Sequence, residues 1–562
     1  MLEVVGIGIQ DFEEIQELHN FYVDKTRFIK EWWETNNKVT LITRPRRFGK
    51  TLTMSMLNCF FSNKYEGRGD LFEGLSIWGE EMYRKLQGAY PVISITFAGI
   101  KPNSYNKFLE EMQKLVNGLY LEFTFLQQSE QLDSVEKERI AFLKNFKNPL
   151  LESDLQHAIN DLSLYLQKHF GKKVLILLDE YDTPMQEAYT YGYWEEVVQF
   201  MRGFFNSSFK TNTSVERVIM TGITRVSKES IFSDFNHLKV VTTTSEQFET
   251  AFGFTEKEVF QALDRYGLGD KKSEVKAWYD GFTFGTVSDI YNPWSIINYL
   301  QSKKFTTYWA NTSSNGLVST LVREGSPDLK QQMEQLLKGE TLEVELDEQI
   351  VFSQLTKKKG AIWSLLVASG YLKIMKTQQG EDGNQQYFLR ITNHEVLLMF
   401  QSMVQDWFED DGETYNHFVK ALLRGDVEEM NDYMNLIAED TFSFFDTGRD
   451  KQQPERFYHG FVLGLLVELR GRYEIKSNRE SGFGRYDVAL IPLKDKEQPA
   501  IVIEFKVLRP KKENSLEETV QNALTQIEQK NYDAELVARG ISKDRIRHYG
   551  FAFKGKEVLI GE

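Results

Sequence analysis

The sequence predicts an α/β protein in which a doubly wound parallel sheet comes first, followed by a helical region and a smaller C-terminal α/β domain. Its 562 residues exceed what one hydrophobic core normally organises, so several domains are expected. Hydrophobic residues make up 41% of the chain and charged residues 27%, a balance typical of globular proteins. In residues 1–245, short apolar runs alternate with helical stretches, which is the pattern of a parallel sheet covered by helices.

Four apolar runs are the predicted strands of the first domain, residues 1–245. Long helical connections separate them, so the strands are expected to lie in one doubly wound sheet. The runs are VTLIT (39–43), YPVISITF (90–97), KVLILLD (173–179) and ERVIMTGIT (216–224).

Residues 246–450 are predicted to form a helical lid that contains a winged-helix-like module. Strand signals disappear between residues 250 and 350, and Thr255 followed by Glu258 marks a capped helix start. Between residues 360 and 400 a helix, two strand-like runs around a polar turn, and another helix follow in the order of a winged helix. Such modules bind DNA or pack within a protein, and packing is expected here. A polar stretch with a proline predicts a domain boundary near residue 450.

A phosphate-binding loop is predicted directly after the first strand. In the pattern G-x-x-x-x-G-K-[ST], backbone N–H groups wrap phosphates, the Lys reaches the terminal phosphates and the hydroxyl holds Mg²⁺. An arginine occupies the position of the first glycine, and a strand before and a helix after supply the required context. Whether Arg46 and Arg47 face phosphates or solvent stays open. The residues expected to bind ATP here are Arg44, Arg46, Arg47, Phe48, Gly49, Lys50 and Thr51.

An acidic strand end and a hydroxyl-rich strand end are predicted to complete the nucleotide site. The run LILLDEYD ends in Asp179, suited to the Mg²⁺ shell together with Thr51, and in Glu180, suited to polarising the attacking water. In TGITR, Thr221 or Thr224 is a candidate sensor of the γ-phosphate. Arg225 either stabilises the developing charge or pairs with an acid.

Residues 451–562 are predicted to form a domain with its own metal chemistry. Asp487 stands early on one predicted strand, and Glu504 and Lys506 share a face of the next, because strand side chains alternate. Two carboxylates that fix Mg²⁺ or Mn²⁺, plus a lysine that orients water, are what phosphodiester hydrolysis requires. Gln526 lies on the following predicted helix. An isolated E-x-K on a strand is a weak signal, and its usual meaning is a solvated edge.

Six motifs together give the chain a specific resemblance. FYVDKTRFIKEWWE, RPRRFGKT, LLDEYD, TGITR, WYDGFTFG and YNPWSIINYL resemble the bacterial and archaeal AAA-ATPase-like family, which is often fused to a C-terminal PD-(D/E)XK nuclease-type domain. The resemblance implies that an arginine in place of the first P-loop glycine is a family feature. Asp24, Lys25 and Thr26 match a family motif that either borders the nucleotide base or caps a helix.

The spacing D-x₁₆-E-x-K resembles the PD-(D/E)XK nuclease core, and Gln526 resembles a glutamine often found on the helix of that superfamily. The family pattern of an acid shortly before Tyr458 and His459 favours Glu455 as a further catalytic acid over Glu468. Five residues resemble the turn that precedes the catalytic aspartate, and Arg485 among them is a candidate phosphate contact. They are Glu480, Ser481, Gly482, Gly484 and Arg485.

The predicted function is an ATP-regulated, metal-dependent nuclease acting on DNA, with RNA as the other substrate. The alternative is a nucleotide-dependent switch whose C-terminal domain binds nucleic acid or a partner without cutting it. The net charge of −15 argues against a protein that coats nucleic acid indiscriminately, although residues from Glu455 onward carry a small positive balance. Apolar runs are too short for a membrane helix and the N-terminus lacks a signal-peptide pattern, so a cytoplasmic location is expected.

Overall fold

The computed structural model divides the chain into two compact units. The first contains Met1–Leu317 and Glu343–Leu397, and the second contains Val318–Leu342 and Leu398–Glu562. The structure describes residues 2–224, 237–310, 316–323, 327–337, 339–346, 360–379, 384–409, 414–441, 462, 466–469, 472–481, 484–493, 498–509, 513–555 and 557–562.

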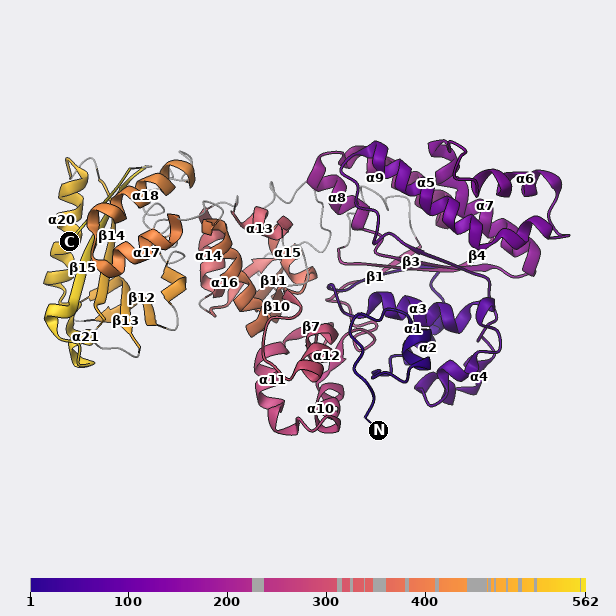
Figure 1. Ribbon diagram of the computed structural model, residues 1–562, viewed down its shortest axis with the longest axis horizontal. Coiled ribbons are helices and arrows are strands. Elements are labelled where there is room, and N and C mark those ends of the chain that lie inside the picture. Colours follow the sequence, from indigo (N-terminus) through magenta and orange to yellow (C-terminus); the bar gives the residue numbers. More distant parts are fainter. Residues whose placement is uncertain are drawn as a thin grey trace. The chain divides into compact units, whose positions relative to one another are not determined.

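A five-stranded parallel sheet forms the centre of the first unit (Figure 1). The four strands predicted from the sequence are confirmed, and a fifth, short edge strand was not predicted. In spatial order the strands are β2 (Val92–Thr96), β3 (Val174–Asp179), β4 (Val215–Gly222), β1 (Val39–Thr43) and β5 (Leu238–Val241). Because all five run in the same direction, the residues that follow β1, β3 and β4 lie at the same end of the sheet, beyond the carboxyl ends of the strands.

Helices cover both faces of this sheet (Figure 1). Large apolar side chains such as Phe60 pack between the sheet and α3, together with Leu175 and Ile219 of the central strands. The helices on that face are α1 (Phe12–Glu17), α2 (Arg27–Glu34), α3 (Lys50–Phe61) and α4 (Glu81–Arg84). Those on the opposite face are α5 (Tyr105–Glu122), α6 (Ser134–Leu143), α7 (Glu152–Phe170), α8 (Thr183–Tyr191) and α9 (Trp194–Phe205). The doubly wound α/β prediction is therefore confirmed.

The predicted lid contains helices and, contrary to the sequence prediction, strands. Its helices are α10 (Glu256–Arg265), α11 (Lys272–Tyr279) and α12 (Pro293–Ser302). Three short strands form an antiparallel sheet in the order β6 (Phe254–Thr255), β8 (Val287–Tyr291) and β7 (Phe282–Phe284). The prediction of a strand-free region was wrong because a tight hairpin buries alternate aromatic residues, Phe282 and Phe284, in runs too short to stand out. The predicted capping box between Thr255 and Glu258 is present at α10.

The predicted helix–hairpin–helix order of the winged-helix-like module is confirmed. It consists of α15 (Ala361–Ala368), β10 (Leu372–Gln379), β11 (Gln385–Ile391) and α16 (His394–Glu409), and a third strand, β9 (Leu342–Glu345), joins its sheet. Two further helices, α13 (Gly316–Arg323) and α14 (Pro327–Leu337), precede β9 in the chain.

A mixed five-stranded sheet forms the core of the second unit. Its strands follow chain order as β12 (Tyr473–Ser481), β13 (Gly484–Pro492), β14 (Ala500–Val507), β15 (Ile546–Lys554) and β16 (Glu557–Gly561), with β14 and β15 parallel. One face packs on α17 (Thr414–Arg424) and α18 (Val427–Thr441), and the other on α20 (Leu516–Gln529) and α21 (Ala534–Ala538).

Helix α18 also covers the outer edge of this sheet. The side-chain amide of Asn431 donates to the carbonyl of Ile560 at 2.8 Å and its oxygen accepts from the N–H of the same residue at 2.7 Å. Asn435 forms the matching pair with Val558 at 2.8 and 2.9 Å. Because an exposed edge strand invites pairing with another chain, these two amides close the edge in place of a sixth strand. Helices α17 and α18 precede residue 450, yet they pack as part of this C-terminal core.

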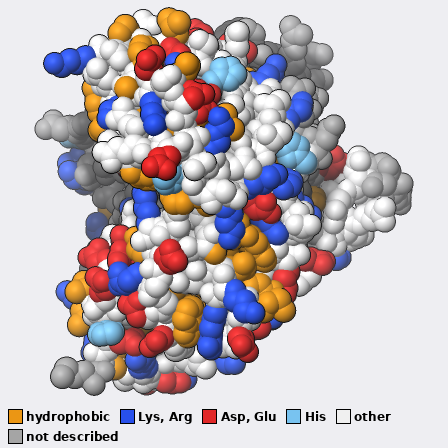
Figure 2. Space-filling model, turned by 90° about the vertical axis from the view of Figure 1, so that its right-hand side faces the viewer, with side chains coloured by type: hydrophobic (Ala, Val, Ile, Leu, Met, Phe, Trp, Pro, Cys, Tyr) orange, Lys and Arg blue, Asp and Glu red, His pale blue; other side chains and the backbone are white. Residues whose placement is uncertain are grey.

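Acidic and basic side chains are interspersed over the face shown in Figure 2. Among the described residues, no helix combines the length and apolar character needed to cross a membrane.

Candidate functional site

The loop between β1 and α3 has the shape of an anion cradle. Arg47 (φ 65°) and Gly49 (φ 82°) both adopt left-handed backbone conformations, and such alternation turns successive N–H groups toward one concavity. Helix α3 begins at Lys50, so its positive N-terminal end points at the same place. The loop therefore has the backbone geometry expected of a phosphate-binding loop.

Lys50 is held inside this cradle. Its ammonium donates to the carbonyls of Arg44 at 3.0 Å and Pro45 at 2.9 Å. Burial lowers the pKa of Lys50, while the carboxylates of Asp179 and Glu180 oppose that shift. Within the part of the chain that the structure describes, both hydrogen-bond acceptors of Lys50 are backbone carbonyls of the loop, which hold its ammonium at the cradle.

Three oxygen-bearing side chains from α3, β3 and β4 converge beside the cradle. The hydroxyl of Thr51 donates to Asp179 Oδ2 at 2.6 Å, and the hydroxyl of Thr221 donates to Asp179 Oδ1. Asp179 and Thr221 are both buried. Carboxylate and hydroxyl oxygens are the donors that Mg²⁺ prefers, so Thr51 and Asp179 suit the metal role predicted for them. The structure also favours Thr221 over Thr224 as the residue next to this metal position.

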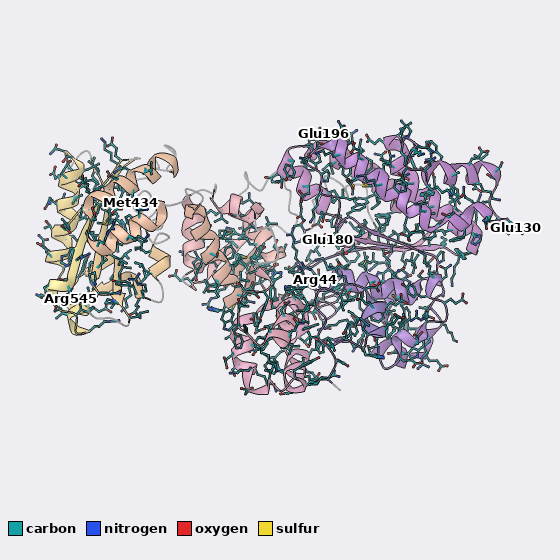
Figure 3. All side chains as sticks on the ribbon, in the orientation of Figure 1. Arg44, Glu130, Glu180, Glu196, Met434 and Arg545 are labelled. Carbon is teal, nitrogen blue, oxygen red and sulfur yellow. The ribbon has the colours of Figure 1, made fainter. Side chains whose placement is uncertain are left out.

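Glu180 occupies an unusual backbone conformation at the carboxyl end of β3. Its φ of 53° lies in the left-handed region, which is uncommon for a residue other than glycine, asparagine or aspartate. The carboxylate is partly exposed and accepts a hydrogen bond from the hydroxyl of Thr183 at 3.2 Å. Backbone strain of this kind clusters at functional sites, and Glu180 lies at the same end of the sheet as Arg44 (Figure 3). Its predicted role in positioning water stays a prediction.

The side chain of Arg44 is turned away from the cradle. Its guanidinium donates to the carbonyls of Thr242 at 2.6 Å and Phe248 at 3.4 Å, and it lies 4.5 Å from the ring centre of Phe284. The group is fully buried, and burial lowers its pKa. Arg44 therefore contributes a backbone carbonyl to Lys50, whereas its charge is used to hold the segment that follows β5.

The other loop side chains also have protein partners. Arg46 donates to the side-chain oxygen of Gln186 at 3.4 Å, and the guanidinium of Arg47 stacks 4.3 Å from the ring centre of Trp294. Phe48 is buried, with its ring centre 4.8 Å from that of Phe282. The loop is therefore packed against the lid along its outer side, and its inner backbone faces the cradle.

Asp182 is a residue of this site that the sequence did not single out. Its Oδ2 accepts from the N–H groups of Ile223 at 3.0 Å and Thr224 at 2.9 Å, and from the Thr224 hydroxyl at 2.8 Å. The amide of Gln186 donates to the same oxygen at 3.0 Å. Asp182 thus fixes the turn after β4, directly before the predicted Arg225, which lies outside the described residues. The second aspartate of LLDEYD was the available signal.

The motif Asp24-Lys25-Thr26 has structural partners. Asp24 accepts from the N–H and hydroxyl of Thr26 at 2.9 and 2.6 Å. The ammonium of Lys25 donates to both carboxylate oxygens of Glu258 at 2.8 Å, which ties the N-terminal segment to α10 of the lid. Helix α2 starts after Thr26 without a side-chain capping bond, so these contacts brace the N-terminal segment against Ser76 and α10.

In the second unit, one face of β14 holds the predicted metal-site residues. Ile501, Ile503 and Phe505 face α17 and α18, so the alternating positions Glu504 and Lys506 face α20. The register that pairs Val488 with Ile503 brings Asp487 next to Glu504 on that face.

Side-chain contacts join these residues into one network. Asp487 Oδ2 accepts from the N–H of Phe505 at 2.8 Å. The side-chain oxygen of Gln526 accepts from Lys506 at 2.7 Å, and its amide donates to Glu504. The ammonium of Lys506 lies 3.6 Å from Glu504. The two carboxylates, adjacent on one sheet face, offer oxygen ligands suited to a divalent metal, and Lys506 beside Glu504 supplies a positive charge next to that position.

Close packing of α20 on the sheet brings Gln526 into this network. Gly550 lies opposite Glu504 on β15, and a Cβ there would approach the carbonyl of Val520 to 2.9 Å. Tyr532 was missed by the sequence interpretation: its buried hydroxyl accepts from the Gln526 amide at 3.2 Å.

Other predictions for this domain fall where the structure gives no side-chain description. Glu455, Tyr458, His459 and Gly482 lie outside the described residues, and between residues 451 and 470 the structure describes Val462 and the short helical turn Leu466–Leu469. The strands β12 and β13 pair Glu480 with Arg485 and Ser481 with Gly484, which places the predicted turn between them.

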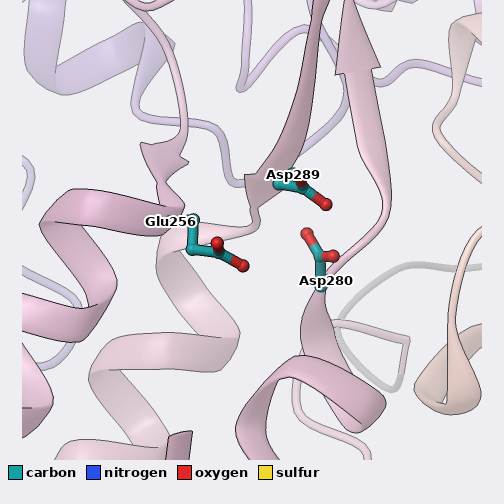
Figure 4. Close-up of side chains that lie close together, drawn as sticks. All are labelled: Glu256, Asp280 and Asp289. Carbon is teal, nitrogen blue, oxygen red and sulfur yellow. The ribbon is translucent and has the colours of Figure 1, made fainter. Parts of the chain in front are cut away.

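A separate acidic cluster lies in the lid (Figure 4). One carboxylate oxygen from each of Glu256, Asp280 and Asp289 falls within 4.8 Å of the others. The ammonium of Lys276 hydrogen-bonds to Glu256 and lies 3.4 Å from Asp289 and 3.9 Å from Asp280. Since a lysine already supplies the counter-charge, this cluster serves as an ion-pair network that braces the hairpin β7–β8.

Comparisons with known proteins match the two regions of the chain that contain these residues. Residues 6–232 match the family model described as "Predicted AAA-ATPase", AAA-ATPase-like, and residues 453–562 match that of the PD-(D/E)XK nuclease superfamily. A protein of Azotobacter chroococcum mcd 1, described as "Uncharacterized protein in vnfD 5'region", is 27% identical over 332 residues. That alignment covers 58% of this chain and 58% of the relative. The chain thus carries an AAA-ATPase-like domain at its N-terminal end and a PD-(D/E)XK nuclease superfamily domain at its C-terminal end.

Proposed function

We propose that the chain binds and hydrolyses Mg-ATP and uses that cycle to control metal-dependent cleavage of DNA by its C-terminal domain. The observation that carries the proposal is the convergence of Lys50, Thr51 and Asp179 around one cradle of backbone N–H groups. Phosphoryl transfer needs mainly positioning and charge stabilisation, and these groups supply both.

Each residue has a definite task in hydrolysis. The loop N–H groups and Lys50 would bind the β- and γ-phosphates, and Thr51 and Asp179 would hold Mg²⁺, which neutralises phosphate charge when bound. Glu180 would orient a water in line with the γ-phosphate and accept its proton, while the water oxygen bonds to phosphorus and the bond to the β-phosphate oxygen breaks. The turn fixed by Asp182 leads to Arg225, which stabilises the charge on the transferred group.

The C-terminal domain is proposed to hydrolyse a phosphodiester. Asp487 and Glu504 would hold Mg²⁺ or Mn²⁺, which polarises the scissile phosphate and supplies a nucleophilic water. Lys506 orients that water and offsets charge, and Gln526 links Lys506 to Glu504. Glu455 is the proposed further acid. The nuclease superfamily match is the property that points to nucleic acid as the substrate class. Within that class DNA is the proposed substrate and RNA is the alternative.

The test uses the full-length protein and two matched pairs of variants. ATP hydrolysis should be lost in Lys50→Ala and kept in Lys85→Ala, which removes an exposed lysine from the end of α4. Nicking of supercoiled plasmid with Mn²⁺ should be lost in Glu504→Gln and kept in Glu528→Gln, an exposed position on α20. A labelled RNA of the same sequence is the parallel substrate. Equal ATP hydrolysis by both lysine variants would refute the nucleotide site. A protein that cuts neither DNA nor RNA under any nucleotide condition would refute cleavage and favour a binding role.

A further inference from the structure

The carbonyl of Arg46, in the phosphate-binding loop, is hydrogen-bonded from outside the sheet domain. The indole N–H of Trp309 donates to it at 3.1 Å, and the side-chain amide of Asn292 donates to it at 3.3 Å. Both donor residues are almost completely buried, with exposed fractions of 2% and 1%. Neither donor lies within residues 6–232, so these two contacts come from the lid and not from the region that the AAA-ATPase-like model matches.

Peptide geometry makes this contact relevant to phosphate binding. In a trans peptide the C=O and the following N–H point in opposite directions, and the described chain contains no cis bond. Two donors that hold the Arg46 carbonyl toward the lid therefore direct the Arg47 N–H away from the lid and into the cradle. Arg47 needs such support because its left-handed backbone is unfavourable for a side chain of this size.

Asn292 is fixed in place by a second task. Its side-chain oxygen accepts from the N–H groups of Trp294 at 2.8 Å and Ser295 at 3.4 Å, which makes it the N-cap of α12. Its amide is thereby turned outward to the loop. Trp294, in the first turn of the same helix, stacks on the guanidinium of Arg47. One helix start thus holds the carbonyl of Arg46 and the side chain of Arg47.

Trp309 is fixed by the winged-helix-like module. The buried carboxylate of Glu395, in the first turn of α16, accepts from the N–H groups of Tyr308, Trp309 at 2.6 Å and Ala310 at 3.4 Å. It also accepts from the hydroxyl of Ser295 at 2.8 Å, which joins it to α12. Both donors to the loop are therefore anchored to a single carboxylate outside the sheet domain.

We propose that Asn292 and Trp309 are positioning residues of the nucleotide site, which aim the Arg47 N–H at the phosphates and make nucleotide affinity depend on docking of the lid. The inference rests on the proposed ATP binding. Coupling of this kind is reciprocal, so bound nucleotide must in turn stabilise the docked lid.

Asn292→Asp is the discriminating variant. An aspartate keeps the oxygen that caps α12, but it replaces the amide donor with an oxygen that repels the Arg46 carbonyl. Asn298→Asp makes the same chemical change on the same helix, where the amide donates to the carbonyl of Trp294 at 2.8 Å. Trp309→Phe removes the indole N–H and keeps an aromatic ring beside Phe282 and Tyr371.

Mg-ATP affinity is measured by calorimetry on the full-length variants, with kcat and KM for hydrolysis beside it. Asn292→Asp should raise the Kd and KM about tenfold, because it loses one hydrogen bond and adds repulsion between two oxygens. Trp309→Phe should raise them about fivefold, because it loses one hydrogen bond without that repulsion. The kcat at saturating ATP should stay within about twofold, because the groups that touch the reacting atoms are unchanged. Asn298→Asp should match the wild type.

A merely structural defect would reduce the active fraction, and kcat would then fall while KM and Kd stayed constant. That result, or an unchanged Kd in Asn292→Asp, overturns the positioning role. If Lys50→Ala abolishes binding while Asn292→Asp does not weaken it, the proposed function stands and this inference fails. A wild-type protein that binds no ATP, with or without Mg²⁺, overturns both.

Discussion

Replacing Asp182 by asparagine tests whether the turn after β4 is positioned for catalysis. In Asp182→Asn an uncharged amide oxygen can still occupy the place of Oδ2, so the shape of the site is preserved. What changes is the strength of four hydrogen bonds that now end on one charged oxygen, three of them from Ile223 and Thr224.

The magnitude follows from the change of acceptor. A hydrogen bond to a charged group contributes about 1.5–3 kcal/mol and a neutral one about 0.5–1.5 kcal/mol, so each of the three bonds to the turn loses about 1 kcal/mol. Because neighbouring bonds are not additive, about 2–3 kcal/mol in total is a reasonable expectation. If that energy holds Thr224 and the following residue in their catalytic positions, kcat should fall about 30- to 150-fold, at about 1.4 kcal/mol for each factor of ten.

The assay separates this effect from loss of binding. Asp182 reaches the loop by hydrogen bonds through Gln186 and Arg46, and its carboxylate also acts electrostatically on Lys50, so the Kd for Mg-ATP should change far less than kcat and stay within about threefold of the wild-type value. Glu195→Gln, at an exposed position on α9, is the control for the same chemical change. A variant that hydrolyses ATP at the wild-type rate, or one that loses affinity and turnover in parallel, would refute the positioning argument.

Three further expectations follow from the same structure. Glu180→Gln should bind ATP with wild-type affinity, because the cradle is intact, but hydrolyse it at least about a hundredfold more slowly, because the water is not oriented. Single-turnover kinetics measure this difference. Equal turnover would remove Glu180 from that role. Burial, together with a hydrogen bond that its protonated carboxyl donates to Asp289, raises the pKa of Asp280 to about 7, so the folded chain holds a proton that the unfolded chain releases at lower pH. The free energy of unfolding should therefore fall as pH rises from the ordinary aspartate range to about 7. The difference in melting temperature between pH 5 and pH 8 should be a few degrees smaller in Asp280→Asn than in the wild type. The lowered pKa of Asp289 acts below this pH window. A fragment of residues 414–562 should melt cooperatively. A fragment of residues 451–562 lacks α17 and α18, which cover one face of the sheet, so it should bind a hydrophobic dye and melt without a sharp transition. A cooperative melt of the shorter fragment would contradict this.

The central sheet was predictable because its strands are buried on both faces. β3 is apolar at every position before Asp179, and such a run leaves little choice of secondary structure. The acid that ends the run then falls at the edge where β1 also ends. The sequence therefore predicted Lys50, Thr51 and Asp179 as one site, because strand direction alone brings them together.

The residues that were missed act through partners distant in sequence. Asp182 binds backbone N–H groups about 40 residues away, and no local pattern reveals which backbone groups a carboxylate will meet. Tyr532 reaches the metal-site network through Gln526, and only the packing of α20 on the sheet makes that contact. The hairpin β7–β8 was missed for a different reason. Its strands are short, and Phe282 is buried against Phe48 of the phosphate-binding loop, which is far away in the sequence.

The missing first glycine of the phosphate-binding loop has a physical explanation in the lid. Arg44 fits at that position because its side chain leaves the cradle and enters a buried site made by the carbonyls of Thr242 and Phe248 and the ring of Phe284. A glycine would remove the guanidinium bonds to both carbonyls, which would then rely on the backbone N–H groups of Ser245 and Ala251, and it would leave a cavity beside Phe284. The backbone carbonyl of Arg46 likewise accepts hydrogen bonds from the side chains of Asn292 and Trp309. Positions 44 and 46 thus both depend on residues that follow the AAA-ATPase-like match at 6–232, so a protein cut at residue 232 should not retain the geometry of this loop.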